Sequence, residues 1–188
     1  MDDPQPSTAP AEDVIAATRT WMEKAVIGLG LCPFAAHAHV RDQIRYVVSD
    51  HSEPDDLLED LAREAQLLHA TNPKLCETTL LIHPRALSDF YEYNEFLAVA
   101  DEALSDLDLE GELQVASFHP GYQFAGTSTD DIENFTNRSP YPMLHLLREA
   151  SVTRAVDTYP DVDDIGPRNI ETLRSLGHEG WKRLWLSA

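Results

Sequence analysis

The chain has 188 residues, of which 43% are apolar and 25% are charged, and 33 acidic residues against 14 basic ones give a formal net charge of -19. This length and composition predict a globular protein with one sizeable core. The negative charge argues against nucleic acid as the main partner, because the few arginines and lysines form no basic stripe for phosphate backbones.

The N-terminal sequence MDDPQPSTAPAED is acidic and rich in proline, and it has neither the basic nor the apolar region of a secretory signal. No run approaches the roughly 18 apolar residues that a membrane span needs. We therefore expect a cytoplasmic protein without a membrane segment, whose two cysteines, Cys32 and Cys76, are reduced.

The first half of the chain predicts a short tail followed by the start of an α/β domain. Residues 1–10 are expected to be a flexible tail, and residues 11–188 a single domain. Apolar residues at helical spacing predict a helix over Ala11–Leu29. The β-branched and aromatic content of Gln43–Ser49 predicts a strand, and a helix with a leucine-rich face follows from about Ser52 to Leu68.

The second half continues the alternation of strands and helices. Thr78–His83 is a nearly apolar strand, Leu87–Leu107 a long helix and Glu112–Phe118 a third strand. A long loop then leads to helices expected near residues 141–157 and 168–178. Because alternating strands and helices imply crossover connections, we predict a small, mainly parallel sheet of three strands, or slightly more, flanked by helices.

The segment from Phe118 to Glu149 has the composition of a functional loop, with two histidines, two arginines, several amides and two tyrosines. His119 directly follows the third strand, where ligands of open α/β sheets bind. His83 repeats the strand-His-Pro pattern after the second strand, so both imidazoles would line one rim if these strands were neighbours. The alternative for His119 is a turn histidine bonded to a nearby carbonyl.

The helix expected near residues 141–157 would carry a second group of polar candidates. If successive residues are placed 100° apart around this helix, its apolar residues lie on one face, and His145, Arg148 and Glu149 lie on the other. His145 and Glu149 would lie one turn apart, where an imidazole and a carboxylate can share a metal or cooperate in proton transfer. The alternative is an ordinary solvated face.

Several neighbouring residues suit an anionic ligand or complete a pocket. Asn137, Arg138 and a capping Ser139 would lie at the N-terminus of this helix, which favours a carboxylate or phosphate. The alternative is a capping role that orders the loop. Cys32 would follow a helix C-terminus, so it is either a buried small hydrophobe or a thiol activated by a nearby histidine. Cys76 is expected to be structural.

Four strings of the chain are similar to a known family: LCPF (31–34), TTLLI (78–82), ASFHPGYQFAG (116–126) and NRSPYPMLHLLREASV (137–152). They resemble the bacterial and plastid domain-of-unknown-function family 1415, over about residues 18–184. The resemblance implies an intracellular single-domain protein and supplies no reaction. His83 and Cys76 lie outside the signature positions, which are Cys32, His119, Tyr122, Gln123, Asn137, Arg138, His145, Arg148 and Glu149.

These candidates lead to three hypotheses. The first is a small-molecule enzyme that acts on an anionic substrate. His119, His145 and Glu149 would bind Fe or Zn, or act without metal as acid–base groups, and Cys32 would be a further catalytic residue. Its substrate would contact the five remaining signature residues: Tyr122, Gln123, Asn137, Arg138 and Arg148. The second is a non-catalytic module that binds a metabolite or haem. In the third, the polar strings only order the long loop.

Overall fold

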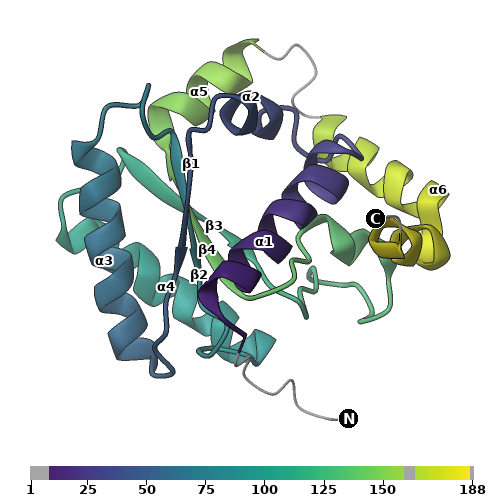
Figure 1. Ribbon diagram of the computed structural model, residues 1–188, viewed down its shortest axis with the longest axis horizontal. Coiled ribbons are helices and arrows are strands. Elements are labelled where there is room, and N and C mark those ends of the chain that lie inside the picture. The colour runs from purple at the N-terminus through teal and green to yellow at the C-terminus, as the bar shows by residue number, and fades with distance from the viewer. Residues whose placement is uncertain (1–8, 159–163, 187–188) are drawn as a thin grey trace.

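The computed structural model describes residues 9–158 and 164–186 (Figure 1). The predicted tail therefore lies outside the described residues except for Ala9 and Pro10. The structure is an α/β fold in which helices cover both faces of a four-stranded sheet. No helix in the described part of the chain combines the length and apolar character needed to cross a membrane.

The sheet has the order β1-β2-β4-β3 and is mixed. Strands β1 (Ile44–Val48) and β2 (Thr78–Ile82) pair in parallel, joined by the crossover helix α3 (Pro54–Ala70). Helix α4 (Phe90–Asp106) leads from β2 to β3 (Leu113–Phe118), which runs in the same direction. The three predicted strands are therefore all present and share one direction, as crossover connections require.

The fourth strand corrects the prediction of a helix near residues 141–157. β4 (Met143–Arg148) lies between β2 and β3 and is antiparallel to both, so the sheet is not mainly parallel. Its apolar residues match a helical period, but both faces of this central strand are covered, and a continuous apolar run satisfies that position equally well. Only the second half of the predicted helix forms, as α5 (Glu149–Thr158).

Helices lie on both faces of the sheet (Figure 1), and an apolar layer fills the space on each side. Helices α3 and α4 pack on one face, where Leu81, Leu144 and Leu146 are fully buried. The opposite face carries Leu80, Ile82 and Met143 and is covered by the N-terminal helices. The alternation along β2 and β4 therefore assigns each strand residue to one of two separate cores.

The predicted N-terminal helix is divided into two forms. An α-helix, α1 (Ala11–Trp21), is followed without interruption by a π-helix, η1 (Met22–Ile27), and a short helix, α2 (Ala35–Val40), precedes β1. The wider turn continues beyond η1, where the amide of Gly28 donates to the carbonyl of Glu23 and that of Leu31 to Val26. π-Helical segments are rare in proteins, and those that do occur are often found at functional sites.

The last part of the chain covers the long loop after β3. This loop contains a 3-10 helix, η2 (Ile132–Thr136), against which α6 (Ile165–Leu186) packs. Gly177 interrupts α6 with φ 64° and ψ 172°, a conformation open to glycine because it has no Cβ. The kink divides α6, and the part after Gly177 carries Trp181 and Trp185.

Candidate functional site

His119 follows β3 as expected, but both nitrogens of its ring are engaged. The amide of Gly121 donates to Nδ1 at 2.9 Å, so Nε2 carries the hydrogen and donates to the carbonyl of Leu87 at 3.2 Å. The ring is buried against Phe90 and Tyr93 of α4, and this burial lowers the pKa of His119. His119 is therefore a neutral imidazole that fixes the turn after β3.

His145 lies on β4, on the opposite face of the sheet from the α4 layer that holds His119. Thr78 donates its hydroxyl hydrogen to the carbonyl of Leu146 at 2.6 Å, so its oxygen accepts from Nε2 of His145 at 2.7 Å. Burial lowers the pKa of His145 to about 4. This imidazole is also neutral and holds neighbouring strands together.

The pairing of His145 with Glu149 rested on a helical turn that does not form. Along an extended strand, residues four apart are separated by about 13 Å, against about 6 Å on a helix. Glu149 begins α5 after β4 has ended. Over residues 9–158 and 164–186, no three His, Cys, Asp or Glu side chains group as a metal ion would require. The structure does not bring His119, His145 and Glu149 together.

His83 does approach His119, although β4 separates their strands. The two imidazole rings pack on the same tyrosine, with centroids 5.8 Å (His83) and 5.0 Å (His119) from that of Tyr93. The Nδ1 of His83 donates to the carbonyl of Ala86 at 3.0 Å, and Nε2 is buried without a partner. Burial lowers the pKa of His83 to about 4, and no cavity opens beside it among those described.

The two arginines expected to clamp an anion instead bind backbone carbonyls. Arg148 lies on the α3 face and donates through one nitrogen to the carbonyls of Leu68, Thr71 and Cys76, at 2.6, 2.7 and 3.2 Å. It thereby caps the C-terminus of α3, where a cation also offsets the helix dipole. Because its guanidinium is bound at the end of α3, Arg148 is not placed to clamp a ligand.

Arg138 is bound in a comparable way within the long loop. Its Nε donates to the carbonyl of Tyr122 at 3.1 Å and one terminal nitrogen to that of Thr129 at 2.6 Å. The guanidinium carbon lies 4.4 Å from the centroid of the Phe135 ring, a cation–π contact. Burial lowers the pKa of Arg138, although the group keeps its charge.

Amide side chains order the same loop. Asn137 donates to the carbonyl of Ser117, Gln123 to that of Thr127, and the ring of Tyr122 packs between Phe90 and Phe124. The residue at the centre of this network is Asn134, which sequence reasoning missed. Asn134 is fully buried, accepts from the amide of Phe124 and donates to the carbonyl of Ser128. These contacts agree with the hypothesis that part of the polar composition serves loop structure.

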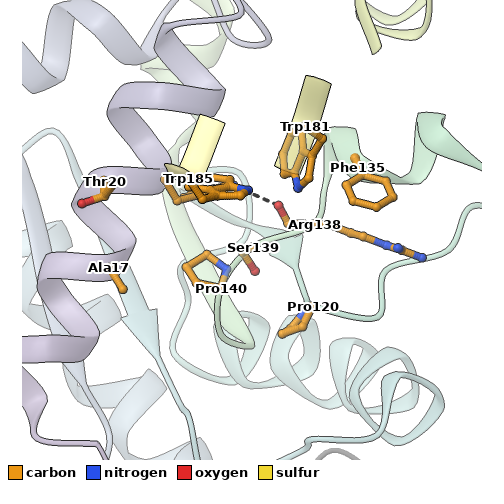
Figure 2. A pocket seen from close by; sticks show the side chains of 10 residues that line it. Ala17, Thr20, Pro120, Phe135, Arg138, Ser139, Pro140, Trp181 and Trp185 are labelled. Carbon is orange, nitrogen blue, oxygen red and sulfur yellow. Dashed lines mark hydrogen bonds between the residues drawn. The ribbon is translucent and has the colours of Figure 1, made fainter. Parts of the chain in front are cut away.

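A cavity of about 460 Å³ lies between α1, the long loop and the second part of α6 (Figure 2). We call it the tryptophan cavity, because all three tryptophans of the chain line it. Its walls are Ala17, Thr20, Trp21, Pro120, Phe135, Arg138, Ser139, Pro140, Trp181 and Trp185. Arg138 is the only charged residue among them, and its side chain extends along the Phe135 ring (Figure 2).

The aromatic rings of this cavity hold one another in place. Trp181 contacts Phe135 at 5.0 Å and Trp185 at 5.6 Å between ring centroids, in both cases edge to face. Trp21 donates from Nε1 to the carbonyl of Arg138 at 2.9 Å. The indole of Trp21 is buried, whereas 40% of the Trp185 surface is exposed. The cavity is thus formed by rings from three distant segments of the chain.

A second cavity, of about 190 Å³, lies on the other side of residues 135–139. We call it the cysteine cavity; its walls are Val26, Leu31, Cys32, Phe118, Thr136, Asn137 and Asn169. Phe135 and Arg138 line the tryptophan cavity, while Thr136 and Asn137 between them line this one. Burial raises the pKa of Cys32, so its thiol is neutral and not an activated nucleophile.

The sequence offered a weak signal for the tryptophan cavity. Trp181 and Trp185 are four residues apart, which places both on one helix face, and Trp21 fitted the apolar face of the N-terminal helix. Nothing in the sequence joins these two helices, because their contact depends on the path of the long loop. The predicted candidates nevertheless include three residues that line a cavity: Cys32, Asn137 and Arg138.

A family model described as "Protein of unknown function (DUF1415)" matches residues 13–183. The chain therefore belongs to this family, as the resemblance of its signature strings indicated. Searches of curated proteins and of solved structures found no match. Conclusions about function consequently depend on the geometry described above.

Proposed function

We propose that this protein binds an uncharged small molecule through a planar aromatic ring held in the tryptophan cavity. The observation that carries the proposal is that the chain's three tryptophans, together with Phe135, line one opening. Cavities that bind small molecules are typically about 300–1,000 Å³ and are lined mainly by apolar and aromatic side chains. At about 460 Å³ the tryptophan cavity has this size and this composition.

Several features support binding of a flat ring. Aromatic pairs contribute roughly 0.5–1.5 kcal/mol beyond the burial of their area, and indoles provide the largest faces. Edge-to-face contacts fix the ring of Trp181 between Phe135 and Trp185, so less side-chain entropy is lost on binding. The π-helix begins directly after Trp21, which is consistent with a functional position for this indole.

Charge favours a neutral ligand over the anionic one expected from the sequence. Arg148 binds the end of α3, and Arg138 already binds two carbonyls and a phenyl ring. The net charge of -19 also repels anions from the molecule as a whole. No carboxylate lines the cavity among its described residues, so an organic cation would lack a counter-ion there.

Binding is better supported than catalysis. The hydroxyls of Thr20 and Ser139 donate to the carbonyls of Ala16 and Tyr141, and the described lining contains no histidine, cysteine or carboxylate to transfer a proton. It also offers none of the usual axial ligands of haem iron, which are His, Cys, Met and Tyr. The donor set therefore does not fit haem, and we propose a ligand without a metal.

Paired dyes test this proposal. N-phenyl-naphthylamine is uncharged, and anilinonaphthalene sulfonate adds a sulfonate to the same ring system. We expect the uncharged dye to bind with one site per chain, to quench tryptophan emission, and to bind roughly tenfold more tightly than the sulfonate, since charge burial is unfavourable. Trp185→Ala should weaken dye binding about tenfold, because one stacking contact is lost.

Tyr91→Ala is the matched control, because Tyr91 is an exposed aromatic residue on α4, outside the cavity. It should leave the dissociation constant unchanged. Equal binding by the Trp185→Ala variant and the native protein, or tighter binding of the sulfonate, would contradict the proposal.

A further inference from the structure

The cysteine cavity has a different chemistry from the tryptophan cavity. Val26, Leu31 and Phe118 provide apolar walls, and the polar lining consists of a thiol, a hydroxyl and two carboxamides. None of the lining side chains in the described structure is charged. Apolar walls with a few polar groups are typical of small-molecule sites, and at about 190 Å³ this cavity is smaller than most of them, so it suits one small functional group.

The two carboxamides are oriented by their own hydrogen bonds. Asn169 is 6% exposed and donates from Nδ2 to the carbonyl of Leu31 at 2.8 Å. Asn137 donates from Nδ2 to the carbonyl of Ser117 at 3.2 Å. Because a carbonyl oxygen accepts only, these bonds identify the nitrogen of each carboxamide. The acceptor atom of each carboxamide is therefore its Oδ1.

This arrangement defines the complementary group. Two oxygen acceptors match the two hydrogens of a primary amide or urea nitrogen, and the hydroxyl of Thr136 can donate to its carbonyl. The oxygens of a carboxylate would face the two Oδ1 acceptors without a hydrogen to share. An ammonium ion would be buried in a small cavity that has no carboxylate to balance its charge. An uncharged amide avoids both penalties.

We propose that the cysteine cavity is a second binding site, specific for an uncharged amide-type group, with the thiol of Cys32 on its wall. The site lies beside the tryptophan cavity, since Phe118 of one contacts Trp21 of the other at 5.3 Å between ring centroids. The inference does not depend on ligand binding in the tryptophan cavity, because its evidence comes from different residues.

Alkylation of Cys32 provides a direct test, because two reagents differ only in the group of interest. In iodoacetamide and iodoacetate, the thiolate attacks the methylene carbon, a C–S bond forms, the C–I bond breaks, iodide leaves and the thiol proton passes to solvent. Cys76 is an internal reference in the same molecule, with a partly buried thiol bonded to the carbonyl of Thr78. Mass spectrometry of peptides measures both rates.

We expect the iodoacetamide-to-iodoacetate rate ratio to be at least about tenfold larger at Cys32 than at Cys76, since a hydrogen-bonding site rejects analogues that leave its groups unpaired. Acetamide should slow methyl methanethiosulfonate labelling of Cys32, while acetate and ammonium chloride should not. The same rate ratio at both cysteines would overturn the proposal. Acetate or ammonium chloride that slowed the labelling of Cys32 as much as acetamide does would also overturn it.

Two substitutions separate binding from structure. Thr136→Val keeps the shape of the side chain and removes its hydroxyl, and Asn169→Leu removes one acceptor. Both should reduce the ratio at Cys32 towards that at Cys76. If Asn169→Leu fails to fold, as judged by circular dichroism, Thr136→Val alone decides the result. An unchanged ratio in a folded variant contradicts the assignment.

Discussion

At the scale of single residues, polar side chains that suggested chemistry are bound to the backbone. His119 and Arg138 each engage two backbone groups, and Arg148 engages three carbonyls. A sequence shows which donors are present but not which orphan carbonyls they will satisfy. Buried backbone groups need hydrogen-bond partners. In a long loop, polar side chains provide these partners, and in the sequence such a group of polar side chains resembles a reactive site.

Arg148 gives the clearest test of this structural role. Arg148→Ala should lower the free energy of unfolding by about 3 kcal/mol, because carbonyls at the end of α3 lose a charged donor. Arg148→Lys keeps a charged donor and should lose less. Urea denaturation measures both, and dye binding in the tryptophan cavity should persist in the folded variants. A stability loss below about 0.5 kcal/mol for Arg148→Ala, typical of a surface site, would contradict the capping role.

At the scale of elements, the strands β1, β2 and β3 and the helix α4 agree with the predictions from their residue patterns. The exceptions are instructive. Met143–Arg148 has good helix formers and a helical apolar period, yet it becomes β4 because β2 and β3 offer backbone partners on both sides. Strand formation there depends on distant segments, and intrinsic propensities of under about 1 kcal/mol per residue do not decide it.

The π-helix is the element that glycine makes possible. An ideal Cβ on Gly28 would collide with the carbonyl oxygen of Lys24 and lie 3.0 Å from that of Glu23. Gly28→Ala should therefore destabilise the protein by about 1–3 kcal/mol through overpacking. It should also weaken dye binding in the tryptophan cavity, because Trp21 directly precedes η1 and would shift with it. Thermal unfolding and fluorescence titration measure the two effects.

Gly166→Ala is the control for this substitution. Gly166 lies in the first turn of α6, and an added Cβ would meet no atom within 4 Å apart from its chain neighbours. Alanine in a helix is favoured over glycine by roughly 0.5–1 kcal/mol, whereas the following Pro167 disfavours a Cβ on the preceding helical residue, so the two effects oppose and this variant should be close to the native protein in stability. A Gly28→Ala variant as stable as Gly166→Ala would show that the π-helix adapts at little cost.

At the scale of the whole molecule, buried histidines couple folding to pH. Burial lowers the pKa of His83 and of His145 from 6.5 to about 4. Below pH 6.5 the unfolded chain binds protons at these positions and the folded protein does not, so stability falls as pH decreases from about 6.5 to 4. Each histidine should contribute a loss of about 3 kcal/mol across this window.

Urea denaturation at several pH values tests this coupling. His145→Asn should reduce the slope of unfolding free energy against pH by about one proton, after the overall loss of stability is subtracted. The exposed His69 is the control, and His69→Asn should leave the slope unchanged. A native protein equally stable at pH 7 and pH 5 would show that these imidazoles gain protons without unfolding.

The sequence by itself determined the α/β class, three strand positions, the long helix α4 and family membership, because local apolar periods and signature strings depend only on nearby residues. It also indicated that the segment after β3 is unusual. Only the tertiary structure decided that His119 and His145 lie on opposite faces, that Arg148 caps a helix, and that three tryptophans meet. The physical reason is that pairing, capping and cavity walls join residues far apart in the chain, and no local pattern specifies such contacts.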